Sequence, residues 1–134
     1  MEELEITVSQ EQGRAPVTVF HLKGRMNLGT VEQLQAKAQE TTQAGARYML
    51  LDLTGVQSLT SAGLRVIHQI YQLLRDASTA GGDEAARKAQ AGALKSPHLK
   101  LLNPTPDVRR VLQIAGFDMF LEIHDDKKDA VASF

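Results

Sequence analysis

Hydrophobic and polar positions alternate in the first part of the chain. Leu4, Ile6 and Val8 are separated by polar residues, and this two-residue period is typical of a half-buried strand. Residues 9–16 indicate a polar turn, and residues 17–22 form a second run of strand-forming side chains. Because the connection is short, we expect the two strands to be antiparallel.

The period then changes to that of a helix. Hydrophobic side chains recur at helical spacing over 31–42, and Gly45 stands where a helix often ends. The apolar run 48–53 suits a strand buried on both faces, and we expect a loop to follow it. A second helix is predicted from Thr60 or Ser61, with an apolar face made of Leu64, Ile67, Ile70, Leu73 and Leu74.

Residues 78–98 interrupt this alternation. They combine small residues, a run of alanines and mixed charges, which predicts a mobile loop or a marginal surface helix. Beyond them we expect a strand at 99–103, a helix from Thr105 to Gly116, a short strand at 120–124 and an amphipathic segment at 125–134.

The order of these elements predicts an α/β fold. Strands that alternate with helices pair in parallel, so we expect a mixed, mostly parallel sheet with an antiparallel N-terminal strand, packed against about four helices. A chain of 134 residues has the size of one ordinary domain. We therefore expect a single domain over residues 1–134, with an unusual insertion at 78–98.

Composition and charge exclude several classes of function. The net charge of −1 gives no general electrostatic reason to bind nucleic acid or an anionic membrane. The absence of cysteine excludes disulfides and thiolate metal sites. No apolar run approaches the roughly 20 residues that span a bilayer, and the acidic N-terminus does not resemble a signal peptide. We expect a soluble, cytoplasmic protein.

The sequence also argues against an enzymatic activity. Its histidines, His21, His68, His98 and His124, lack metal-ligand spacing. A Ser-His-Asp site could in principle use Ser61, but the residues before this serine lack the glycine of a nucleophile elbow. No glycine-rich phosphate-binding loop is present. We therefore expect no catalysis, no metal and no cofactor.

Ser61 marks the connection around which the chain is organised. It follows the buried strand and its loop at the head of the second predicted helix. A hydroxyl oxygen at a helix start can accept an orphan backbone N–H, so a plain interpretation makes Ser61 an N-cap whose replacement by alanine costs about 1 kcal/mol. A capping serine is also an exposed one.

The residues around Ser61 resemble the signature of STAS domains. The segments 52–56 and 59–64, Asp-Leu-Thr-Gly-Val and Leu-Thr-Ser-Ala-Gly-Leu, look like the part of that family that contains the bacterial anti-sigma factor antagonists. In those proteins a hydroxyl residue before the glycine is phosphorylated by a partner serine kinase, and the resemblance places that role on Ser61. Thr60 and Ala62 differ from the Asp and second Ser that the family often has at these positions.

The resemblance also implies a partner-binding edge. A second contact loop would correspond to Gly24, Arg25, Met26 and Asn27, beside a loop that contains Thr54, Ser58, Leu59, Thr60, Ala62 and Gly63. Asn27 alternatively forms an ordinary helix cap, and Gly63 alternatively permits tight packing of helix on strand. Asn27 and Thr60 replace residues that are often acidic in the family, which makes this edge less negative.

Three functions follow from these observations. The first is an anti-sigma factor antagonist that binds a serine-kinase anti-sigma factor, is switched off by phosphorylation of Ser61 and is reset by a serine phosphatase, so that it regulates transcription indirectly. The second is a STAS scaffold or small-ligand sensor that is never phosphorylated. The third is a small hydrolase that uses Ser61. The sequence is also compatible with a homodimer.

Overall fold

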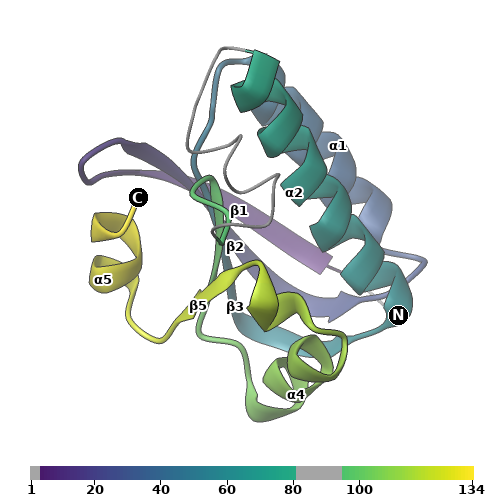
Figure 1. Cartoon of the computed structure of the whole chain (residues 1–134). Coiled ribbons are helices and arrows are strands. Elements are labelled where there is room, and N and C mark those ends of the chain that lie inside the picture. Colours follow the sequence, from purple (N-terminus) through teal and green to yellow (C-terminus); the bar gives the residue numbers. More distant parts are fainter. Residues whose placement is uncertain (1–3, 81–94) are drawn as a thin grey trace.

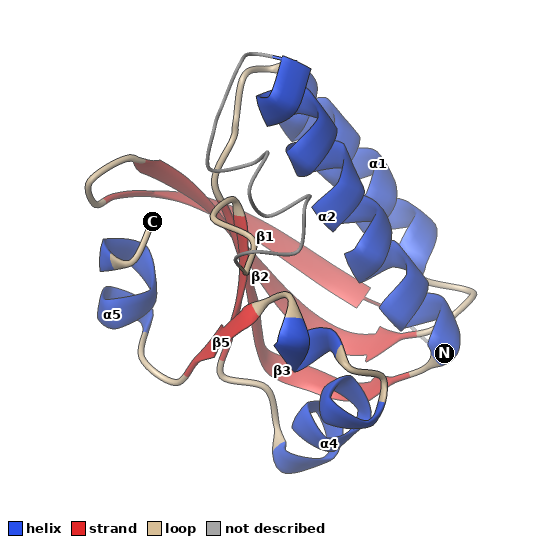
Figure 2. Cartoon of the chain, in the orientation of Figure 1, coloured by secondary structure: helices blue, strands red, loops and turns tan. Residues whose placement is uncertain are grey.

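The computed structural model describes residues 4–80 and 95–134 of the chain. The described part contains a five-stranded sheet, four α-helices and one 3-10 helix, shown in Figure 1 and coloured by type in Figure 2. The strands are β1 (Leu4–Gln12), β2 (Pro16–Met26), β3 (Met49–Leu59), β4 (Leu99–Leu102) and β5 (Glu122–His124). The helices are α1 (Val31–Gln43), α2 (Ser61–Ala80), α4 (Pro106–Ile114), η1 (Phe117–Met119) and α5 (Lys127–Ala132).

The sheet confirms the expected α/β fold. The strands lie in the order β1-β2-β3-β4-β5, β1 pairs antiparallel with β2, and every later pair is parallel. The helices that connect the parallel strands supply the long crossovers that parallel pairing needs. The carboxyl ends of β2 and β3 therefore meet at one edge of the sheet, where the start of α2 follows β3 directly.

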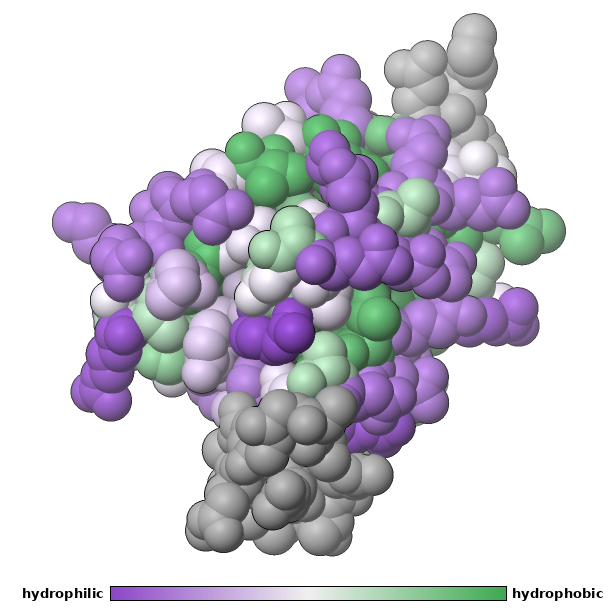
Figure 3. All heavy atoms as spheres, turned by 90° about the horizontal axis from the view of Figure 1, so that it is seen from above, coloured by the Kyte–Doolittle hydropathy of each residue, from purple (hydrophilic) through white to green (hydrophobic). Residues whose placement is uncertain are grey.

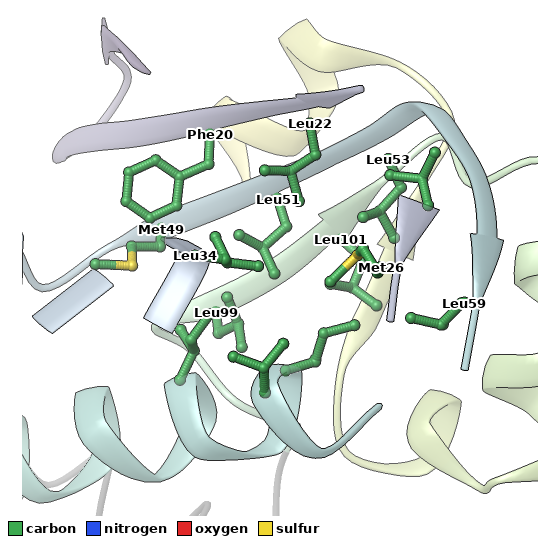
Figure 4. Close-up of a cluster of buried hydrophobic side chains, with 14 of the residues drawn as sticks. Phe20, Leu22, Met26, Leu34, Met49, Leu51, Leu53, Leu59, Leu99 and Leu101 are labelled. Carbon is green, nitrogen blue, oxygen red and sulfur yellow. The ribbon is translucent and has the colours of Figure 1, made fainter. Parts of the chain in front are cut away.

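Two hydrophobic clusters cover the two faces of the sheet. The larger one joins alternate side chains of the strands to α1, α2 and α4, and Figure 4 shows its centre, with Phe20, Leu51 and Leu101 directed from the sheet toward the helices. The smaller one packs Val17, Val19, Leu50 and Leu102 against Ala130 and Val131 of α5. The surface seen from above in Figure 3 is mainly hydrophilic, with small separate hydrophobic areas.

Three strands are longer than the sequence predicted. β1 continues to Gln12, β2 continues to Met26 and β3 continues to Leu59, so the expected turn at 9–16 and the expected loop after Leu53 are wrong in extent. Pairing explains the difference, because polar residues gain ladder hydrogen bonds even where one face is exposed. Register shifts in the β2–β3 pair accommodate Gly55, which marks a bulge instead of a turn.

The remaining elements largely follow the predictions. Thr105 caps α4 by accepting from the Val108 N–H at 3.3 Å, and Gly116 ends that helix with a positive φ of 79°. The predicted strand at 120–124 shortens to β5 because η1 precedes it. Helix α2 extends to residue 80, so residues 78–80 of the predicted mobile loop or marginal helix are the last residues of a long helix. Residues 81–94 of the predicted insertion lie outside the described part.

Candidate functional site

The start of α2 is fixed to the end of β2 by the residue before Ser61. Both the backbone N–H and the hydroxyl of Thr60 donate to the carbonyl oxygen of Met26, each at 3.1 Å. The carbonyl of Thr60 accepts the first helical hydrogen bond, from the Leu64 N–H at 3.0 Å. Thr60 therefore occupies the N-cap position and Ser61 is the first helical residue, which corrects the prediction that Ser61 is the cap.

Gly63 allows this close approach of helix and strand. It is buried, and a Cβ atom added there would lie 2.9 Å from the carbonyl oxygen of Met26 and would also collide with the side chain of Leu59. Of the two interpretations offered for Gly63, the structure supports tight packing within the chain. Met26 and Leu59 are buried as well, so these three residues support the predicted partner-binding edge from below and do not present side chains on its surface.

The turn between β2 and α1 forms the neighbouring part of this edge. The Thr30 hydroxyl donates to the carbonyl of Arg25 at 2.7 Å, and the side-chain oxygen of Asn27 accepts from the Gly29 N–H at 2.9 Å. Thr30, not Asn27, holds the N-cap position of α1. These bonds tie the turn together and leave the Leu28 side chain 79% exposed.

Exposed and half-buried residues of both segments surround one surface depression. It has a volume of about 440 Å³ and is lined by Asn27, Leu28, Thr60, Ser61, Ala62 and Arg65. Four of these six were predicted from the sequence as phosphorylation or partner-binding residues. We name this surface the Ser61 edge. Ser61 itself is exposed on it, one turn of helix before Arg65.

Leu28 and Arg65 are the site residues that sequence reasoning missed. Residues four apart on a helix lie on one face, so the spacing of Arg65 from Ser61 could have revealed it. Arg65 is exposed and makes no ion pair with any residue that the structure describes. Leu28 gave a weaker signal, namely a large apolar side chain within a turn of polar and glycine residues.

Four other predicted residues lie apart from the depression, namely Gly24 and Arg25 near the end of β2 and Thr54 and Ser58 on β3. Ser58 is half-buried and pairs with Arg25 across the β2–β3 ladder. Thr54 belongs to a polar cluster in the middle of β3, where its backbone N–H and hydroxyl donate to Asp52 Oδ1 at 3.0 and 2.6 Å. Its oxygen also accepts from the Asn103 side-chain amide at 3.2 Å. The structure therefore brings Thr54 to Asp52 and Asn103, not to Ser61.

The charge of Asp52 is set by this cluster. Burial raises the pKa of the carboxyl group, but hydrogen bonds from Thr54 and His21 lower it more, so the net pKa is below the ordinary value. Asp52 is therefore ionised at neutral pH. Among the residues that the structure describes, no group of three His, Asp or Glu side chains is arranged to hold a metal ion.

Comparisons with known proteins agree with this fold. The family model of the STAS domain matches residues 8–80. BtrV of Bordetella bronchiseptica, whose name assigns it provisionally as an anti-sigma factor antagonist, is 30% identical over 113 residues, which are 84% of this chain and 82% of BtrV. No helix in the described ranges is both long and apolar enough to cross a membrane.

Solved structures show the same fold at lower identity. An anti-sigma factor antagonist from Mycobacterium paratuberculosis superposes with a TM-score of 0.72 at 18% identity, covering 97% of this chain and 92% of that one. The phosphorylated form of SpoIIAA, a cell fate determinant of Bacillus, superposes with a TM-score of 0.62 at 20% identity, covering 95% and 96%. From its family match and its relationship to BtrV, this chain belongs to the STAS domain family.

Proposed function

We propose that this chain is an anti-sigma factor antagonist that binds a serine-kinase anti-sigma factor through the Ser61 edge and loses that partner when Ser61 is phosphorylated. The observation that carries the proposal is the position of Ser61, exposed as the first residue of α2 beside an apolar side chain and a cation. The relationship to BtrV supports the same role.

The edge combines the features of a protein contact. Leu28 supplies an exposed apolar anchor, and Thr60, Ser61 and Asn27 surround it with polar groups. Protein interfaces combine an apolar core with a polar rim. The depression continues into a second one between α1 and α2, which shares Leu28, Ala62 and Arg65 with it.

A phosphate group on Ser61 suits the fold but not a closely packed interface. It would add close to two negative charges at a helix start, where the free N–H groups and the macrodipole favour anions. Arg65 lies one turn further along α2, at the spacing that allows an ion pair. At an interface the same phosphate would have to be desolvated, so phosphorylation separates the partners without unfolding the domain.

The test begins with the partner. The wild-type protein is expected to co-purify from its source cell with an ATP-binding serine kinase, and that kinase, purified, is expected to transfer the γ-phosphoryl group of ATP to the Ser61 hydroxyl. The variant Ser61→Ala should bind the kinase without accepting phosphate. Ser61→Asp should bind at least tenfold more weakly, which corresponds to about 1.4 kcal/mol.

A matched control separates the site from added charge. Gln113→Asp places the same charge on an exposed position of α4 and should bind like the wild type. Equal binding of the kinase by the wild type and Ser61→Asp, or phosphate found on another residue, would overturn the proposed role of Ser61.

A ligand-sensing function is the second candidate, and a separate depression favours it. This depression has a volume of about 450 Å³ and lies at the opposite end of the parallel strands, lined by Gln10, Pro16, Thr18, Thr41, Ala44, Gly45, Ala46, Arg47 and Tyr48. Thr18 is buried there, and one guanidinium nitrogen of Arg47 donates hydrogen bonds to the carbonyl oxygens of Thr42 and Ala46. Stabilisation of the purified wild type by a small anionic metabolite, lost in Arg47→Ala, would support this candidate.

A further inference from the structure

The open part of the sheet face opposite α1 and α2 carries a chain of three polar side chains. Ser9 of β1, His21 of β2 and Asp52 of β3 occupy neighbouring positions on this face. His21 is in register with Asp52 on one side and with Thr7 on the other, and Ser9 lies two residues after Thr7 on β1. The Nε2 atom of His21 is 2.9 Å from the Ser9 hydroxyl oxygen, and its Nδ1 atom is 2.8 Å from Asp52 Oδ2.

The direction of these hydrogen bonds follows from the charge on Asp52. An ionised carboxylate only accepts hydrogen bonds, so Nδ1 of His21 carries the proton that Asp52 binds. In the neutral imidazole, Nε2 is then an acceptor, and the Ser9 hydroxyl donates to it. Thr54 occupies the other oxygen of Asp52 with two hydrogen bonds, which fixes Oδ2 toward the imidazole.

This arrangement has the roles of an activated nucleophile. A serine hydroxyl is weak at its own pKa and becomes reactive when an adjacent base, oriented by a third group, takes its proton. Ser9 is partly exposed, and the side chains of His21 and Asp52 retain 33% and 17% of their surface. A reagent can therefore reach the hydroxyl from solvent while the carboxylate stays largely covered.

We infer that Ser9 is an acyl-acceptor site for activated carboxylic esters and thioesters. The Ser9 oxygen forms a bond to the carbonyl carbon as its proton passes to His21 Nε2. The bond from that carbon to the leaving oxygen or sulfur then breaks, and the leaving group takes the proton from His21. The product is an ester of Ser9, which is a covalent modification distinct from the proposed phosphorylation of Ser61.

A second serine of the chain lies near a histidine but is not activated in the same way. The Ser133 oxygen is 3.4 Å from His124 Nε2, and its hydroxyl donates to the Ala130 carbonyl at 2.6 Å while accepting from Lys100 at 2.9 Å. Its proton is thus directed to a carbonyl, which is not a useful base. Ser133 therefore serves as an internal control for the reactivity of Ser9.

The experiment treats the full-length protein with p-nitrophenyl acetate and locates the acetyl group by peptide mass mapping. Ser9 should be acetylated in the wild type and in Ser133→Ala, whereas Ser9→Ala should carry no acetyl group at position 9. In His21→Gln the acetylation of Ser9 should slow by about 100-fold, the low end of the effect of a general base. Added imidazole should restore acetylation to His21→Ala, which a purely structural role of His21 would not allow.

Asp52 acts through His21 as a positioning residue, so its test needs a spectroscopic signal. The wild type should show a downfield proton resonance from His21 Nδ1–H that is lost in Asp52→Asn together with most of the acetylation of Ser9. Equal rates at Ser9 in the wild type and His21→Gln would overturn the inference. So would labelling of Ser133 as fast as that of Ser9, because proximity to any histidine would then suffice.

Discussion

The replacement of Gly63 by alanine tests whether the Ser61 edge depends on the close contact between α2 and β2. At an unconstrained helix position this change stabilises a protein by about 1 kcal/mol, because glycine is a poor helix former. At Gly63 the new Cβ would lie 2.9 Å from the Met26 carbonyl oxygen and 3.0 Å from its Cβ atom. Met26 is fully buried, so neither atom can move into solvent.

The two effects can be weighed against each other. Overpacking a filled core costs about 1–3 kcal/mol, and this cost opposes the gain in helix propensity. The net expectation is a loss of up to about 2 kcal/mol in the free energy of unfolding. To relieve the collision, α2 must move away from β2, which also weakens the hydrogen bonds from Thr60 to Met26.

Urea unfolding measures the stability and amide hydrogen exchange reports on Thr60. The neighbouring change Ala62→Gly is the control, since it should cost about 1 kcal/mol from propensity alone. We expect Gly63→Ala to speed exchange at Thr60 selectively. A variant that is more stable than the wild type by about 1 kcal/mol, with unchanged exchange at Thr60, would refute the reasoning.

Three further changes probe other parts of the molecule. Hydrogen bonds hold the pKa of Asp52 below its ordinary value, so their contribution is complete above about pH 4 and is lost as the pH falls through the folded-state pKa; Asp52→Asn should flatten the acid limb of stability against pH. The buried Lys100 fixes the end of α5, so Lys100→Ala should lower the free energy of unfolding by about 1–3 kcal/mol and speed amide exchange in α5. The control Lys127→Ala removes a half-exposed ion pair and should lower it by less than about 1 kcal/mol. Ser61→Asp should raise the free energy of unfolding by about 0.3–1 kcal/mol, because the helix dipole favours a negative charge at the start of α2. Arg65→Ala should remove part of this gain, and a Ser61→Asp variant that is unfolded would contradict the prediction.

The sequence predicted the elements well where periodicity and end signals agree. Helix α4 is the best case, because a capping threonine, a proline in the first turn and a terminal glycine all act within a few residues. The order of strands and helices also predicted the mixed sheet. These signals are local, so they can be recognised in the sequence without knowledge of any long-range contact.

The misses concern residues whose environment comes from distant partners. Residues 54–59 look like a loop because they are polar and include a glycine, yet pairing with β2 keeps them in the sheet. Ser61 and Thr60 both suit an N-cap, and only the carbonyl of Met26, 34 residues away in the chain, selects Thr60. The hydrogen bonds of His21 likewise depend on strand register, which no spacing of histidines reveals.

The long strand β3 has a consequence for how fast and how tightly another molecule can be bound. Because the ladder with β2 continues to Leu59, the backbone that leads to the Ser61 edge is already ordered before any encounter. A partner then has no loop to freeze on arrival, which avoids a cost of about 1–2 kcal/mol for each residue that would otherwise be ordered. Release can then be governed by a single chemical group on a rigid support, without refolding of this chain.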